Sequence, residues 1–67
     1  MADQKDTIDT FFDDPSEALG TAQCLASTEW EMDFISQQIA RYNRFGDMML
    51  LSQKQADIIR RIGRLGQ

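Results

Sequence analysis

Few of the side chains that commonly perform catalysis or bind metals occur in this sequence of 67 residues. Histidine is absent and Cys24 is the one cysteine, so a zinc site and a nucleophile with a neighbouring base both lack their usual groups. The carboxylates lie near the N-terminus, at helix starts and on solvated helix faces, which disfavours acid–base catalysis. The four glycines are separated, so no glycine-rich phosphate loop is present. The sequence therefore predicts a protein that is not an enzyme and has no cofactor, metal site or small-molecule substrate.

Side chains that suit a protein interface are more plentiful. Aromatic residues are common anchors of interfaces, and methionine adapts to irregular surfaces. The chain has more of both than the core of two helices needs. We therefore predict that a protein partner is bound by Trp30, Phe34, Tyr42, Phe45, Met48 and Met49. Two other uses of these side chains stay open, namely packing on the N-terminal helix and contact with a second copy of the chain.

A group of cations near the C-terminus indicates a second kind of partner. Lys54, Arg60, Arg61 and Arg64 could contact phosphates, and two helices with a connector have the outline of a helix-turn-helix. The connector, however, is long and apolar, and the overall acidity opposes DNA at a distance. Nucleic-acid binding is therefore the alternative function. These cations could equally form a solvated face that complements the helix dipole.

Charge is divided unevenly along the chain. Residues 1–37 contain nine acids and one lysine, a net charge of −8, whereas residues 38–67 contain six cations and two acids, a net charge of +4. The sum is −4. Such asymmetry is typical of an acidic segment beside a nucleic-acid-binding module, or of two halves that attract each other within the chain or across a dimer.

The clearest helix is predicted over residues 28–46. Thr28 and Glu31 have the spacing of a capping box, and Gly46 can adopt the left-handed conformation that follows a helix. At 100° per residue, one broad face contains the apolar side chains. These are Trp30, Phe34, Ile35, Ile39, Tyr42 and Phe45.

A second helix is predicted from Ser52 to about Leu65. Ser52 and Gln55 form another capping box, and Ile58, Ile59 and Ile62 recur at helical spacing. The connector at residues 47–51 is mostly apolar, which is unusual for an exposed loop. We therefore expect its side chains to fold back beneath the two helices.

The N-terminal part is less regular. Asp14 and Pro15 are typical of a helix start, and they predict a short helix over residues 15–26 in which Cys24 is a small buried side chain. Residues 1–12 are predicted to be an acidic, flexible tail, because residues 1–10 contain little apolar surface to bury. Phe11 and Phe12, at its end, should pack on other side chains, and one of them could form a hydrophobic staple over the next helical turn.

These elements predict an all-α fold with one small domain, residues 13–67. It would be a bundle of two well-formed helices and a shorter N-terminal helix. A chain of this length buries only about 60% of its unfolded surface, so dimerisation is one way to complete the core. We expect a cytoplasmic protein without membrane contact, because no apolar run is long enough for a bilayer span and no secretory signal is apparent.

The two helices also carry a pattern that resembles known proteins. Trp30-x-x-x-Phe34-Ile35 is followed by Leu51-Ser52-x-Lys54-Gln55-x-x-Ile58-x-x-Arg61-Ile62. This combination, within residues 28–63, is similar to short helical segments of bacteriophage- and prophage-associated proteins. The resemblance implies a phage setting, near replication or host-interaction functions, and does not imply a particular activity.

We therefore expect a non-catalytic helical interaction protein that binds a cytoplasmic macromolecular partner. In a phage setting it would modulate or inhibit host machinery. A nucleic-acid-binding accessory factor that uses the basic C-terminal helix is the first alternative. A self-assembling structural protein is the second.

Overall fold

The predicted capping box at Thr28 starts the longest helix. The computed structural model describes residues 5–65, and its helix α3 spans Glu29–Phe45. The Thr28 hydroxyl accepts a hydrogen bond from the Glu31 amide, and the Glu31 carboxylate accepts one from the Thr28 amide. Gly46 ends the helix at φ 61°, a conformation that glycine adopts at little cost. The predicted bounds of this helix are therefore confirmed.

The other two predicted helices also form. In α4 (Gln53–Gly63), the Ser52 hydroxyl accepts from the Gln55 amide and the Gln55 side chain accepts from the Ser52 amide. Helix α2 (Pro15–Leu25) begins at Asp14, whose carboxylate accepts from a backbone amide of the first turn. Cys24, on this helix, is exposed, so the prediction that it is buried was wrong.

A small sheet makes the fold mostly helical instead of purely all-α. Strand β1 (Lys5–Thr7) pairs antiparallel with β2 (Leu50–Ser52), and Asp6 lies opposite Leu51. Neither strand was predicted from the sequence. Each has three residues and their pairing joins distant parts of the chain, so neither has the alternating pattern that identifies a longer strand.

The segment predicted to be a flexible tail forms part of the domain wherever the structure describes it. After β1, the short helix α1 (Ile8–Phe11) follows directly, and the Ile8 amide donates to the Met49 carbonyl at 2.7 Å. Ile8 is fully buried and Phe12 nearly so. The domain therefore includes residues 5–12. The remainder of the predicted tail, residues 1–4, lies outside the described residues.

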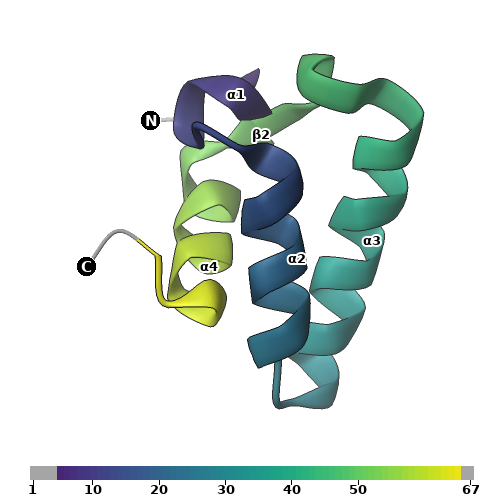
Figure 1. Cartoon of the computed structure of the whole chain (residues 1–67), viewed down its shortest axis with the longest axis vertical. Helices are drawn as coiled ribbons and strands as arrows, with labels where there is room; N and C mark the ends of the chain where they lie inside the picture. The colour runs from purple at the N-terminus through teal and green to yellow at the C-terminus, as the bar shows by residue number, and fades with distance from the viewer. Residues whose placement is uncertain (1–4, 66–67) are drawn as a thin grey trace.

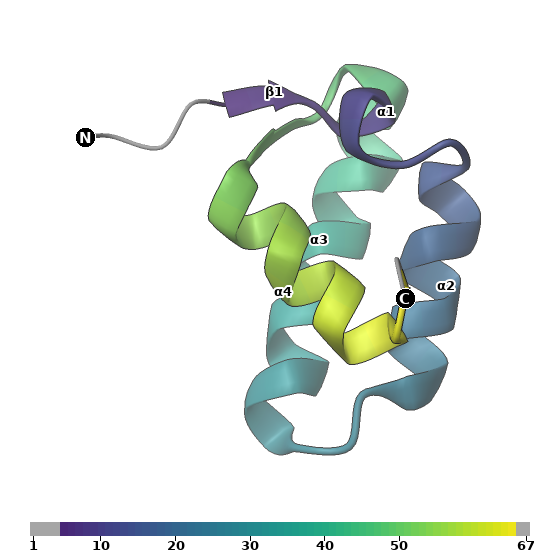
Figure 2. The same ribbon diagram turned by 90° about the vertical axis from the view of Figure 1, so that its left-hand side faces the viewer.

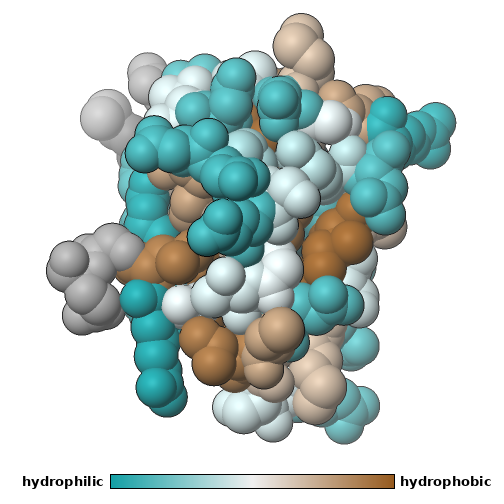
Figure 3. All heavy atoms as spheres, viewed as in Figure 1, coloured by the Kyte–Doolittle hydropathy of each residue, from teal (hydrophilic) through white to brown (hydrophobic). Residues whose placement is uncertain are grey.

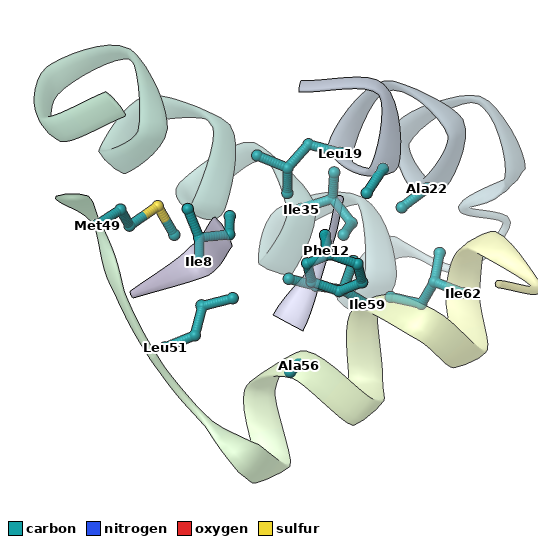
Figure 4. Close-up of a cluster of buried hydrophobic side chains, with 11 residues drawn as sticks. Ile8, Phe12, Leu19, Ala22, Ile35, Met49, Leu51, Ala56, Ile59 and Ile62 are labelled. Carbon is teal, nitrogen blue, oxygen red and sulfur yellow. The ribbon is translucent and has the colours of Figure 1, made fainter. Parts of the chain in front are cut away.

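The helices pack around α2. Figure 1 shows α2 between α3 and α4, and Figure 2 shows the strands and α1 across one end of the three helices. All four α-helices contribute to the core in Figure 4, together with Phe12, which follows α1, and with Met49 and Leu51 between α3 and α4. The buried hydrophobic residues are Ile8, Phe12, Ala18, Leu19, Ala22, Ile35, Met49, Leu51, Ala56, Ile59 and Ile62. This single core accounts for the stability of the helical arrangement.

The apolar connector between α3 and α4 is only half buried. A 3-10 helix, η1 (Gly46–Met48), leads into β2, and from Met48 to Leu51 the side chains alternate between solvent and the core, as in a strand. Met49 and Leu51 are buried, whereas Met48 is 75% exposed and Leu50 is 47% exposed. The expectation that the connector folds beneath the helices therefore holds for alternate residues.

The face over α2 presents small hydrophobic areas separated by hydrophilic and neutral ones (Figure 3). None of the helices within residues 5–65 has the length and apolar composition that a bilayer span requires.

Candidate interaction groove

The start of α3 holds a tryptophan at the protein surface. Trp30 is the second residue of the helix, so the capping box beside it determines its position. The Glu31 carboxylate accepts from the amides of Ser27 and Thr28 at 2.9 and 3.2 Å. The hydrogen bond from the Ser27 amide, followed by that from Thr28, lowers the pKa of Glu31. The tryptophan therefore extends from a turn held by three backbone-to-side-chain hydrogen bonds, yet 61% of its surface is exposed.

One helical turn further on, Phe34 supports the tryptophan. The two rings are stacked, with centroids 5.4 Å apart and planes inclined by 7°. Phe34 is partly buried and packs against the core, so it joins Trp30 to the interior of the domain. Stacking of this kind restricts the tryptophan side chain before any partner arrives, which lowers the entropy lost on binding.

Helix α4 forms the opposite wall of a groove beside these rings. Ile62 is buried at its base, Ile58 is partly exposed on its wall, and the volume is about 420 Å³. We call it the Trp30 groove. It is lined by Trp30, Glu31, Lys54, Asp57, Ile58, Arg61 and Ile62. It combines an aromatic anchor, aliphatic walls and charged edges, which is the composition of many protein docking sites.

In the Trp30 groove, the acidic side chains have hydrogen-bond partners, whereas the two basic ones have no ion-pair partner within residues 5–65. The Glu31 carboxylate is held by its capping hydrogen bonds, and the Asp57 carboxylate accepts from Gln53 and Arg60. Among the described residues, Arg60 and Asp57 form the one ion pair in which a side-chain nitrogen and a carboxylate oxygen lie within 4.0 Å. Lys54 and Arg61 therefore lie in the groove without a carboxylate partner from within residues 5–65.

The structure divides the predicted partner-binding residues among three places. Trp30 lines the groove and Phe34 stacks on that ring from behind the lining, whereas Tyr42, Phe45 and Met48 lie near the other end of α3. Phe45 is 52% exposed and its ring lies beneath the Arg44 guanidinium, 5.5 Å away. Met49 is only 1% exposed, so the prediction that it is available to a partner was wrong. Its burial follows from the strand-like alternation of the connector.

Tyr42 has an intramolecular partner at that far end of the helix. Its hydroxyl donates to the Asp47 carboxylate at 2.9 Å, and this hydrogen bond raises the pKa of Tyr42. The contact joins the last turns of α3 to η1. Tyr42 is therefore better placed to stabilise the end of the helix than to anchor a partner.

The four predicted basic residues do not act as one patch. Lys54 and Arg61 line the Trp30 groove, and Arg64 follows the end of α4 in a left-handed conformation, φ 55°. Arg60 is directed toward the N-terminal segment, where its guanidinium donates to the Phe11 carbonyl at 3.0 Å. It also lies over the Phe12 ring, 5.2 Å from the centroid. Arg60 therefore connects α4 to the N-terminal segment.

A second hollow, of about 350 Å³, lies on the Arg60 side of α4. It is bordered by Phe11, Phe12, Asp13, Asp14, Glu17, Ala18, Thr21, Arg60 and Leu65. The guanidinium within it is already bonded to Phe11 and Asp57. Within residues 5–65, moreover, no group of three or more cysteine, aspartate or glutamate side chains is arranged to hold a metal ion.

Trp30 and Phe34 could be predicted from the sequence as interface residues, but the wall that faces Trp30 could not. Ile58 was assigned to the apolar stripe of its helix without a surface role. Its spacing from Lys54 and Arg61, four and three residues, places all three on one side of α4. That spacing indicates a mixed apolar and basic edge, but only the packing of α3 and α4 on α2 places Trp30 opposite.

Comparison of the chain with protein-family models, with curated proteins and with solved structures finds no match. Within residues 5–65, the fold and the groove therefore define the molecule only as a small, mostly helical domain with a groove beside an exposed tryptophan.

Proposed function

We propose that this is a non-catalytic interaction protein that binds a macromolecular partner through the Trp30 groove. The observation that carries the proposal is a tryptophan that is stacked on Phe34 and still 61% exposed beside a groove with aliphatic walls. Tryptophan is the residue type most enriched among the dominant contacts of protein interfaces. A large aromatic ring held in this manner supports docking of an apolar side chain or helix.

The sequence pattern at the same residues supports a setting for this binding. Trp30, Phe34 and Ile58 belong to the pattern that resembles phage-associated proteins. In that setting the partner is a component of the host cytoplasm whose activity the protein modulates or inhibits.

The test is affinity capture from a lysate of the cells that express the protein, followed by binding measurements with the purified captured partner. Trp30→Ala and Ile58→Gln change opposite walls of the groove and should each weaken binding at least about tenfold. Phe45→Ala is the matched control, because this ring has similar exposure at the other end of α3. If Trp30→Ala and Ile58→Gln bind the partner as tightly as the wild type and Phe45→Ala do, with helical circular dichroism retained, the proposal is refuted.

One observation favours nucleic acid as a second candidate partner. Lys54 and Arg61 lie in the same groove as an exposed tryptophan, a combination that could contact phosphates and stack a base. Fluorescence anisotropy with single- and double-stranded DNA at two salt concentrations tests this candidate. It predicts binding that weakens with salt and is lost in Lys54→Glu/Arg61→Glu. Salt-independent or absent binding rejects it.

A further inference from the structure

The charges around the Trp30 groove form two opposed sets. Glu29 and Asp33 are exposed and negative, and they lie one residue before and three residues after Trp30 on α3, next to the groove lining and not within it. Lys54 and Arg61 on α4 are exposed and positive, and neither has an ion-pair partner within residues 5–65. The two acids of the groove lining already have partners: Glu31 accepts from the Ser27 and Thr28 amides, and Asp57 accepts from Gln53 and Arg60. The surface therefore contains two exposed acids on α3, a tryptophan, and two cations on α4 that have no ion-pair partner within residues 5–65.

A surface with this composition is complementary to itself. In a two-fold dimer the same patch is used by both subunits, and each half of the patch meets the opposite half of its mate. A two-fold axis through the groove places the acidic start of α3 in one copy against the basic edge of α4 in the other. Each Trp30 ring is then covered by apolar groove wall of the second copy.

The small size of the chain also favours a second copy of the chain as the molecule that covers the groove. A domain of 67 residues has a small core, and such domains commonly gain stability by association. A two-fold dimer would cover Trp30 in both copies. It would also place Lys54 and Arg61 of each copy near the acids at the start of α3 in the other copy. A nucleic acid would meet Glu29 and Asp33 beside the tryptophan, and their charge opposes phosphate.

We infer that the occupant of the Trp30 groove in the free protein is a second copy of this chain. The inference rests on the proposed function in one respect, that the groove is a docking surface. It adds regulation, because a dimer conceals Trp30 and a partner must compete with self-association. Partner binding then depends on protein concentration and on salt.

Sedimentation equilibrium, from low micromolar to millimolar protein, tests the dimer. The wild type should change from monomer to dimer, and Glu29→Lys/Asp33→Lys and Lys54→Glu/Arg61→Glu should each raise the dissociation constant at least about tenfold. An equimolar mixture of the two variants should restore association as a one-to-one heterodimer. Lys5→Glu/Asp13→Lys, which exchanges exposed charges outside the groove lining without changing net charge, should associate as the wild type does.

Three outcomes would overturn the inference: a monomer at every concentration, a dimer that neither reversal weakens, or a mixture that does not associate. Circular dichroism of each variant establishes that it is folded. A monomeric wild type that still loses its captured partner on Trp30→Ala would refute the dimer and leave the proposed function intact. If the wild type is a dimer and its Trp30→Ala variant keeps the captured partner, the proposed function is refuted and the dimer is retained.

Discussion

Arg60 and Arg61 are adjacent, but the structure gives them different uses. Arg60 connects α4 to the N-terminal segment through the Phe11 carbonyl and the two phenylalanine rings, whereas Arg61 is exposed at the groove. We predict that Arg60→Ala lowers the free energy of unfolding by about 1–2 kcal/mol, because a charged hydrogen bond and ring contacts are lost. Arg61→Ala should change it by less than about 0.5 kcal/mol. Urea denaturation measures both, and equal effects would contradict the structure.

The two capping boxes differ in one residue, which predicts a difference in pH dependence. Glu31 has a pKa below its ordinary value of 4.5, mainly because of the Ser27 amide. Its contribution to stability is therefore present above pH 4.5 and is lost as the pH falls through the lowered folded-state pKa. Gln55 occupies the same position in α4 and does not titrate.

Glu31→Gln should therefore destabilise the protein most near neutral pH, and its difference from the wild type should shrink in acid. Gln55→Ala is the control and should cause a loss that does not depend on pH. Thermal melts at several pH values give both quantities. A constant difference between Glu31→Gln and the wild type would contradict the assigned role of the carboxylate.

At the scale of the elements, alanine substitution of two glycines is predicted to have opposite effects on stability. Gly20 lies within α2, where an added Cβ would meet no atom within 4 Å, so Gly20→Ala should stabilise the protein by about 0.5–1 kcal/mol. Gly46 has equal space but φ is 61°, so Gly46→Ala should cost about 1–2 kcal/mol through backbone strain alone. Differential scanning calorimetry compares the two. A stabilising Gly46→Ala would show that α3 ends in another conformation.

The helices could be predicted from sequence because their signals act within a few residues. Thr28 with Glu31, and Ser52 with Gln55, are complete capping boxes before any tertiary contact forms. The sheet could not be predicted in this way, since Lys5–Thr7 gains its partner only when β2 is positioned by the rest of the chain. Trp30 was identifiable as an anchor, but the groove depends on how α3 and α4 each pack on α2. Such packing is a property of the whole molecule.

At the scale of the whole molecule, the N-terminal segment completes the core. Ile8 is fully buried and contributes to the same cluster as Ile35 and Ile59. We predict that Ile8→Ala lowers the free energy of unfolding by about 2–5 kcal/mol through lost burial and a cavity. A chain of this length has a total of roughly 3–10 kcal/mol, so this is a large share. Asp13→Ala, an exposed control, should have little effect, and a stable Ile8→Ala protein would contradict the packing.

The most direct test of the central claim uses the one tryptophan of the chain as its own reporter. Trp30 is 61% exposed in the single chain, so at high dilution its fluorescence should be strongly quenched by acrylamide. When the purified captured partner is added, the emission should shift to shorter wavelength and the quenching should fall, because docking covers the ring. Binding that leaves the emission and the quenching of Trp30 unchanged would show that the partner uses a different surface.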